Sequence, residues 1–181
     1  AGTRFISAPP EAGTDPRRPP GIEGVILGDG YGTSLTTLGD VQNDGASDYA
    51  VGAPNYLNPS TTTGAVFIYH NTPIGQTISI LRSTQLGDGF GYSVAGVGDV
   101  NGDGYNDLLV GAPNHDNGSH TDSGRAYLYL GGSLGINTIP AWQFSTDEDL
   151  AGLGWSVAWA GDVNRDGYDD WMIGAPFHSK L

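Results

Sequence analysis

Three short acidic stretches hold the residues whose types and spacing are best suited to chemistry. The second stretch, residues 99–107, places oxygen-bearing side chains at positions 1, 3, 5 and 9, in the order Asp99, Asn101, Asp103 and Asp107. A glycine at position 6 permits a sharp turn, and the carbonyl of Tyr105 at position 7 supplies a further oxygen. Alternate side chains of a tightly curled loop converge on one point, so the spacing predicts a cation site.

The other two stretches repeat this pattern. In the third, residues 162–170, the predicted ligands are Asp162, Asn164, Asp166, the carbonyl of Tyr168, and Asp170. In the first, residues 40–48, they are Asp40, Gln42, Asp44, the carbonyl of Ala46, and Asp48. Because Gln42 is longer than the Asn that the other two loops have at this position, we expect the first site to be the weakest.

The donor atoms favour calcium. Oxygen ligands without His or Cys suit calcium better than zinc or copper, and a flexible loop with several carboxylates suits it better than magnesium. A helical calcium hand needs an acidic residue at position 12, where this chain has Val51, Val110 and Ile173. The alternative is an acidic Asx turn without metal, but three copies in register argue against it. We expect up to three Ca²⁺ ions, which also contribute to folding because converging carboxylates repel one another without a cation.

The composition places these loops in an all-β chain. The 181 residues include 30 Gly and 11 Pro, and no apolar run approaches the roughly 20 residues of a membrane helix. The net charge of -13 disfavours nucleic acid, which needs clustered Lys and Arg. Of the 20 acidic residues, nine are predicted ligands in the three loops, so we interpret most of the negative charge as metal ligands. The absence of Cys excludes disulfides and thiolate metal sites.

The chain contains an internal repeat. A Gly-x-Gly triplet opens each copy, an acidic loop follows, and Gly-Ala-Pro closes a strand, at residues 52–54, 111–113 and 174–176. The openings stand at residues 30–32, 89–91 and 152–154. We expect repeats over about 28–86, 87–149 and 150–181, the last one truncated, so that 22–181 form one segment. Residues 1–21 are rich in Pro and predict an extended arm or linker.

Each full copy predicts four antiparallel strands. In the second copy these are 92–98, 107–111, 125–130 and 141–145, and the first copy offers matching third and fourth strands at 65–69 and 76–81. Four strands recurring at about 60 residues are typical of a propeller blade. The third copy stops after two strands, and residues 21–27 look like the last strand of a preceding blade. The segment is therefore expected to form an arc of a propeller and not a closed ring. The open sheet edges at its two ends predict either missing chain or oligomerisation.

Phe90-Gly91 followed by Gly111-Ala112-Pro113, bracketing the acidic loop, resembles the FG-GAP repeat of integrin α-subunit propellers and their bacterial relatives. The resemblance covers about residues 22–178 and departs from the pattern at Tyr31, Gln42 and Leu153. It implies a seven-bladed propeller with stabilising calcium between the first two strands of a blade and ligands on the opposite face. The lack of Cys is unlike animal integrin α chains and favours a bacterial or archaeal protein, secreted or at the cell surface.

The resemblance also implies a ligand face. Carried over by position, that face holds the loops 55–64, 114–124 and 147–150. Its candidate contacts are Tyr56, His115, His120 and Phe177. The alternative interpretation of these four is ordinary exposed loop residues. A C-terminal Ser-Lys-Leu, residues 179–181, matches a peroxisomal address, although a chain cut within a repeat explains it as well.

No residue stands out as catalytic. Ser34, Ser93 and Ser156 recur at one register, which indicates an architectural role, and His115 with His120 lacks a third metal ligand. We therefore expect a recognition or adhesion module for a protein or glycan, with the propeller part of a secreted hydrolase or lyase as the alternative. The four Trp residues fall on expected strands, which predicts core packing. An exposed aromatic platform beside carboxylates on the loop face would favour the alternative.

Overall fold

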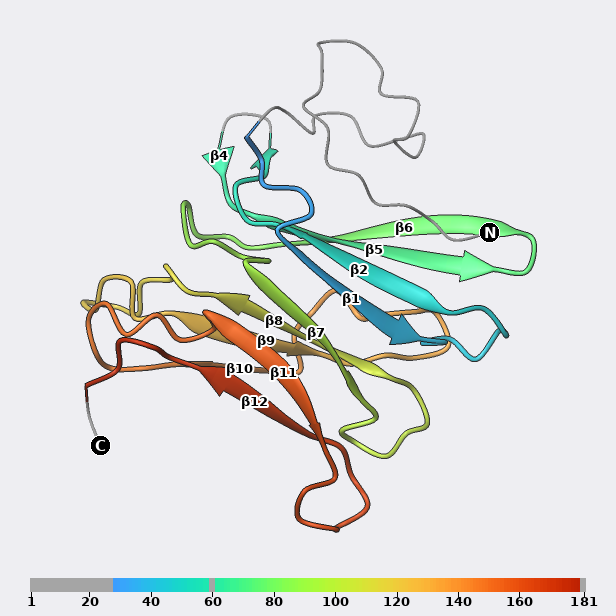
Figure 1. Ribbon diagram of the computed structural model, residues 1–181. Coiled ribbons are helices and arrows are strands. Elements are labelled where there is room, and N and C mark those ends of the chain that lie inside the picture. Colours follow the sequence, from blue (N-terminus) through green and yellow to red (C-terminus); the bar gives the residue numbers. More distant parts are fainter. Residues whose placement is uncertain (1–27, 59–60, 180–181) are drawn as a thin grey trace.

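The computed structural model describes residues 28–58 and 61–179, and all regular structure in this part is β (Figure 1). The expected arm at 1–21, the strand expected at 21–27 and the last two residues lie outside the described residues. Within the described ranges no helix is long and apolar enough to cross a membrane. The all-β prediction is confirmed.

The first repeat forms an antiparallel sheet of four strands. Their order in the sheet is β1-β2-β5-β6. The strands are β1 (Ser34–Gly39), β2 (Asp48–Ala53), β5 (Ala65–Thr72) and β6 (Gly75–Arg82). A short hairpin of β3 (Leu57–Asn58) and β4 (Thr61–Thr62) stands in the connection after β2, where the sequence predicted only a loop.

The second repeat has the same plan, and the third shows its first two strands. The second sheet contains β7 (Ser93–Gly98), β8 (Asp107–Ala112), β9 (Arg125–Tyr129) and β10 (Trp142–Ser145), in that order. The third contains β11 (Ser156–Gly161) and β12 (Asp170–Gly174). The predicted strands are therefore confirmed to within three residues at their ends.

The sheets pack face to face like neighbouring blades, with β7 between β1 and β11 (Figure 1). One apolar cluster, including Leu38, Val66 and Phe90, joins the first sheet to the second. A second cluster, including Val97 and Leu109, joins the second sheet to β11 and β12. Because the second sheet is covered on both faces, all six residues of β8 are buried, which explains its continuous apolar run.

Glycines make the close contact between blades. The Ser34 hydroxyl donates to the carbonyl of Gly91 at 2.8 Å, and the Ser93 hydroxyl donates to the carbonyl of Gly154 at 2.8 Å. A Cβ on Gly111 of the Gly-Ala-Pro triplet would lie 2.0 Å from the Gly154 carbonyl oxygen, a distance that no side chain tolerates. These bonds give the recurring serines of the first two repeats a packing role.

A bulge at the end of each first strand leads into the acidic loop. The pairing register shifts before Gly39, Gly98 and Gly161, and each of these glycines has a positive φ of 67° to 71°. Such a backbone conformation favours glycine. The shared bulge directs all three acidic loops to the same end of the molecule.

Candidate calcium-binding loops

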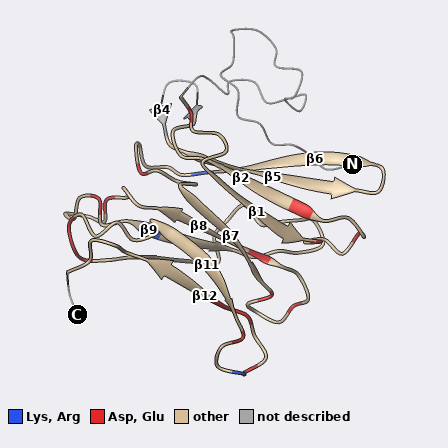
Figure 2. Ribbon diagram, viewed as in Figure 1, with Lys and Arg blue, Asp and Glu red and all other residues tan. Residues whose placement is uncertain are grey.

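The three acidic loops join the first and second strands of their blades. Acidic residues mark the connections β1–β2, β7–β8 and β11–β12, which lie together at one end of the stacked sheets (Figure 2). In each loop the residue at position 9 is the first residue of the second strand. These residues are Asp48, Asp107 and Asp170. The predicted ligands of each loop are thus held between two strands of one sheet.

Side-chain oxygens of the second loop accept hydrogen bonds from the loop's own backbone. Asp99 accepts the N–H of Gly102 at 2.7 Å on one carboxylate oxygen and that of Gly104 at 2.7 Å on the other. Asn101 and Asp103 each accept the N–H two residues further on, at 3.0 Å. These bonds curl the loop and fix the rotamers of the predicted ligands.

The third loop repeats these contacts. Asp162 accepts the N–H groups of Asp166 and Gly167, at 3.1 and 3.0 Å. Asn164 accepts the N–H of Asp166 at 2.8 Å, and Asp166 accepts that of Tyr168 at 3.0 Å. Two loops in different blades therefore share one hydrogen-bond scheme.

The first loop departs from the scheme at position 3. Asp40 accepts the N–H groups of Asp44 and Gly45, as expected, and these two bonds hold the pKa of Asp40 below its ordinary value. The Gln42 side-chain amide donates to the Asp44 carboxylate at 3.0 Å, as the position-3 Asn amides do in the other two loops, but it also donates to the carbonyl of Asn71 at 3.2 Å. Its longer side chain reaches past the loop to the third strand, and the lower affinity of this site stays a prediction.

The position-9 carboxylates of the first two loops are buried. Asp107 is fully buried and accepts N–H groups from Val100 at 2.9 Å and Gly131 at 2.8 Å. Burial raises the pKa of Asp107 to about 6, although both bonds oppose that rise. Burial also raises the pKa of Asp48, and one of its carboxylate oxygens accepts the N–H of Asn71 at 2.7 Å.

Asn71 and Gly131 also help to hold the predicted ligands, and the sequence analysis did not identify them. Asn71 is the next-to-last residue of β5, and Gly131 lies two residues after β9. Each donates its backbone N–H to the position-9 carboxylate of its blade. Backbone donors leave no trace in residue type, and only their place just after an apolar strand run signals them. Each links its acidic loop to the third strand.

The residues present fit a hard cation. Each loop offers carboxylate or amide oxygens, with no His or Cys among the predicted ligands, and backbone N–H groups already hold most of them. Across the part of the chain that the structure describes, no three His, Cys, Asp or Glu side chains form a preassembled metal cluster. The fit therefore rests on the donor chemistry and on the curled loop backbone.

The expected ligand face lies at the other end of the sheets, but two of its candidates need correction. Tyr56 is 4% exposed and packs edge-on against Phe67, and His115 is 6% exposed with its Nδ1 3.5 Å from a carboxylate oxygen of Asp88. Both side chains turn inward because the loops fold back on their blades, so neither is presented to a ligand. Phe177 is 60% exposed, as a contact residue should be.

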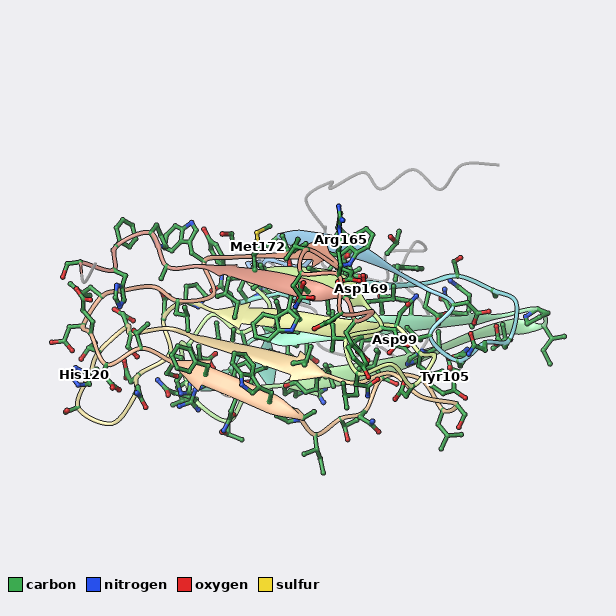
Figure 3. The ribbon with its side chains drawn as sticks, turned by 90° about the horizontal axis from the view of Figure 1, so that it is seen from below. Asp99, Tyr105, His120, Arg165, Asp169 and Met172 are labelled. Carbon is green, nitrogen blue, oxygen red and sulfur yellow. The ribbon has the colours of Figure 1, made fainter. Side chains whose placement is uncertain are left out.

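His120 marks this end in Figure 3, far from Asp99 and Asp169. Its Nδ1 lies 3.2 Å from a carboxylate oxygen of Asp149, and that oxygen also accepts the N–H of Thr121 at 3.0 Å. The half-exposed His120 side chain therefore orients the Asp149 carboxylate on the expected ligand face.

A groove opens on this face between the second and third blades. It has a volume of about 560 Å³. Its lining consists of Pro113, Asn114, Asp122, Asp149, Leu150, Gly152, Trp155 and Phe177. The rings of Trp155 and Phe177 meet edge to face with centroids 5.4 Å apart, and Tyr92 supports Trp155 from 5.1 Å. The groove thus sets aromatic surface beside two carboxylates.

The expectation that all four Trp residues pack in the core is half correct. Trp142 and Trp171 lie 4.7 Å apart against the cluster between the second and third sheets. Trp155 precedes β11, is 41% exposed and lines the groove, whereas Trp159 lies on β11 and is 57% exposed. The sequence marked the strands but not which residues remain uncovered at the third blade.

Comparison with known proteins agrees with the repeat structure. Residues 90–129 and 153–180 match the FG-GAP repeat family. The chain is 32% identical over 173 residues to integrin alpha-3 of Cricetulus griseus, which covers 91% of this chain and 16% of that protein. It is 35% identical over 158 residues to integrin alpha-6 of Gallus gallus, covering 85% of this chain and 14% of that protein.

A relative of another kind is phosphatidylinositol-glycan-specific phospholipase D of Bos taurus, 35% identical over 153 residues, with 78% of this chain and 18% of that protein covered. The chain therefore spans less than a fifth of the length of these curated relatives. Repeated four-stranded blades, the matched repeats and this identity over most of the chain place the protein in the FG-GAP repeat family of integrin-like β-propellers.

Proposed function

We propose that the protein is a calcium-stabilised propeller module that recognises a protein or glycan through the loop face opposite its calcium sites. The observation that carries the calcium assignment is the hydrogen-bond scheme shared by loops 99–107 and 162–170. A loop that fixes its carboxylates with its own N–H groups has its oxygens arranged before a cation arrives, which lowers the entropy lost on binding.

Each residue has a separate part in such a site. Asp99 at position 1 orders the turn through three backbone N–H groups, and Asp103 at position 5 adds a second carboxylate. Asp107 ties the loop to the third strand through Gly131. A bound calcium ion supplies positive charge that offsets the repulsion among these carboxylates.

Isothermal titration calorimetry with Ca²⁺ tests the assignment. We expect up to three ions per chain, and one fewer after Asp103→Asn, because a carboxylate at the centre of the second loop is lost. Asp147→Asn is the matched control, since it removes the same charge from the opposite face, where Asp147 accepts from the Asn117 amide. Absence of heat at millimolar Ca²⁺ would refute the calcium assignment.

We place the ligand site in the groove of Trp155 and Phe177. Exposed rings supply flat apolar area at a small loss of side-chain entropy, and nearby carboxylates and the Asn114 amide supply polar contacts. The similarity to integrin alpha subunits favours a protein ligand. A role in adhesion at the cell surface or outside the cell follows. Extracellular modules bind Ca²⁺ with dissociation constants of about 10⁻⁴ to 10⁻³ M, which is the range we expect for these loops.

Binding to immobilised extracellular proteins and to a glycan array tests the groove. Trp155→Ala and Phe177→Ala each lower binding by about tenfold or more if these rings form the contact. Phe144→Ala is the matched control, because Phe144 is 51% exposed on β10 and lies outside the groove. Equal losses in all three variants would contradict the site.

One observation favours the alternative, a propeller part of a secreted hydrolase or lyase. The groove does combine exposed aromatic rings with the carboxylates of Asp122 and Asp149, and the phospholipase D relative is an enzyme by name. We expect binding without turnover, so chromatography after incubation with a bound glycan or phosphatidylinositol-glycan should show no product. Product that disappears in Asp149→Asn would support the alternative.

A further inference from the structure

The residue at position 8 of an acidic loop, which is not among the predicted ligands, contacts the neighbouring blade. In the second loop this residue is Asn106, and its side-chain amide donates to the carbonyl of Leu38 in the preceding blade at 2.8 Å. In the third loop it is Asp169. The chain thus has two junctions between successive loops, with different chemistry at each.

Asp169 makes hydrogen bonds to both the backbone N–H and the backbone carbonyl of Asp99, the first predicted ligand of the second loop. Its carboxylate accepts the N–H of Asp99 at 3.1 Å, and its own N–H donates to the Asp99 carbonyl at 3.3 Å. The other carboxylate oxygen accepts the indole N–H of Trp159 at 2.9 Å. Figure 3 shows Asp169 and Asp99 at the same end of the sheets. The half-buried Asp169 side chain is therefore fixed from two directions.

Glycine at the bulge leaves room for this contact. A Cβ on Gly98 would lie 2.0 Å from the Asp169 carboxylate, and Gly98 has a φ of 71°. The ring of Tyr168, whose carbonyl is a predicted ligand of the third loop, lies 2.6 Å from a Cβ placed on Gly102 of the second loop. Ligand residues of the third loop thus flank Asp169, and the second loop packs against them.

We propose that Asp169 couples the second and third sites, so that calcium in loop 162–170 raises the calcium affinity of loop 99–107. The proposal rests on the calcium function proposed above. Asp170, the next residue, is the position-9 ligand of the third loop, so closure of that loop fixes the backbone that carries Asp169. An ordered Asp169 in turn fixes Asp99 and adds a negative charge beside the second site. The junction between the first and second loops has no carboxylate link of this kind. The neutral Asn106 binds the carbonyl two residues before Asp40, and the Asn43 amide of the first loop donates to the Gly104 carbonyl of the second at 3.1 Å.

Nuclear magnetic resonance resolves the three sites separately. Gly45, Gly104 and Gly167 each donate their N–H to the position-1 carboxylate of their own loop, so each amide signal reports its own site during a Ca²⁺ titration. Asp169→Ala is expected to lower the affinity reported by Gly104 about tenfold, within the range of ordinary coupling, with less than about twofold change at Gly45.

Two further variants separate coupling from loss of structure. Asp169→Asn keeps an oxygen acceptor for the Asp99 N–H, so it should restore the Gly104 affinity to within about threefold of the parent. Asn106→Ala, the same position in the second loop, should change the affinity reported by Gly45 less than about twofold.

Emptying the third site tests the coupling itself. Asp162→Asn with Asp166→Asn should lower the affinity reported by Gly104 about fivefold or more, although no residue of that loop has changed. If none of the three glycine signals responds to Ca²⁺ in the parent, the calcium function fails. If all three respond, and Asp169→Ala or the emptied third loop leaves Gly104 unchanged, the coupling alone is overturned.

Discussion

At the scale of single residues, burial decides how the position-9 carboxylates behave. Asp107 has a pKa raised to about 6 because it is removed from water, so the folded metal-free protein holds a proton there that the unfolded chain releases near its ordinary value. This residue's contribution to stability is therefore present at acid pH and is lost as the pH rises through about 6.

In the proposed site, calcium has to displace that proton from Asp107. We predict that the affinity of the 99–107 loop is nearly constant above pH 7 and falls about tenfold per pH unit below about pH 6. Titrations of the Gly104 amide signal at pH 7, 6 and 5 measure it. An affinity that stays the same across this range would show that Asp107 is not a ligand.

Gln42 limits the first site by its length. Gln42→Asn should let position 3 accept the N–H of residue 44, as Asn101 and Asn164 do in their loops. We predict a gain in affinity of about fivefold at the 40–48 loop, since one net hydrogen bond is worth about 1 kcal/mol. The Gly45 amide signal reports the change, and Gln143→Asn, at an exposed position of β10 in the second blade, is the control. A weaker site in Gln42→Asn would contradict the assigned register.

At the scale of elements, glycine in the second strand sets how closely blades approach. We predict that Gly111→Ala destabilises the protein by about 1 to 3 kcal/mol, because the added Cβ meets the Gly154 carbonyl. Urea unfolding measures this. Gly75→Ala, also on a strand, meets no atom within 4 Å and should change stability by less than about 0.5 kcal/mol. Equal effects would mean that the blade junction is not tightly packed.

Strands and loop ends were predictable because they are local. The apolar run of β8 and the repeated Gly-Ala-Pro triplets fix the blades, and the spacing of acidic residues fixes the loops. The inward turn of His115 and the exposure of Trp155 were not predictable, because they depend on which sheet covers which loop. The backbone donors Asn71 and Gly131 were missed for the same reason: strand pairing, not residue type, brings them to the carboxylates.

At the scale of the whole molecule, the two ends of the stacked blades differ in chemistry. One end gathers the three acidic loops (Figure 2). The other end, marked by His120 in Figure 3, holds the groove of Trp155 and Phe177 beside the His120–Asp149 pair. The sheets between them are packed by two apolar clusters. Under the proposed function, calcium at one end stabilises the blades that hold the proposed recognition loops at the other.

Thermal unfolding in excess Ca²⁺ and then in excess chelator tests the central claim most directly. When free Ca²⁺ is at a hundred times the dissociation constant of each site, three sites add about 2.7 kcal/mol each, or about 8 kcal/mol in total, to the free energy of unfolding. We therefore predict that chelation lowers the melting temperature by roughly 15 to 30 °C. A melting temperature that changes by less than about 2 °C would contradict the account, because the acidic loops would then be turns that bind no structural calcium.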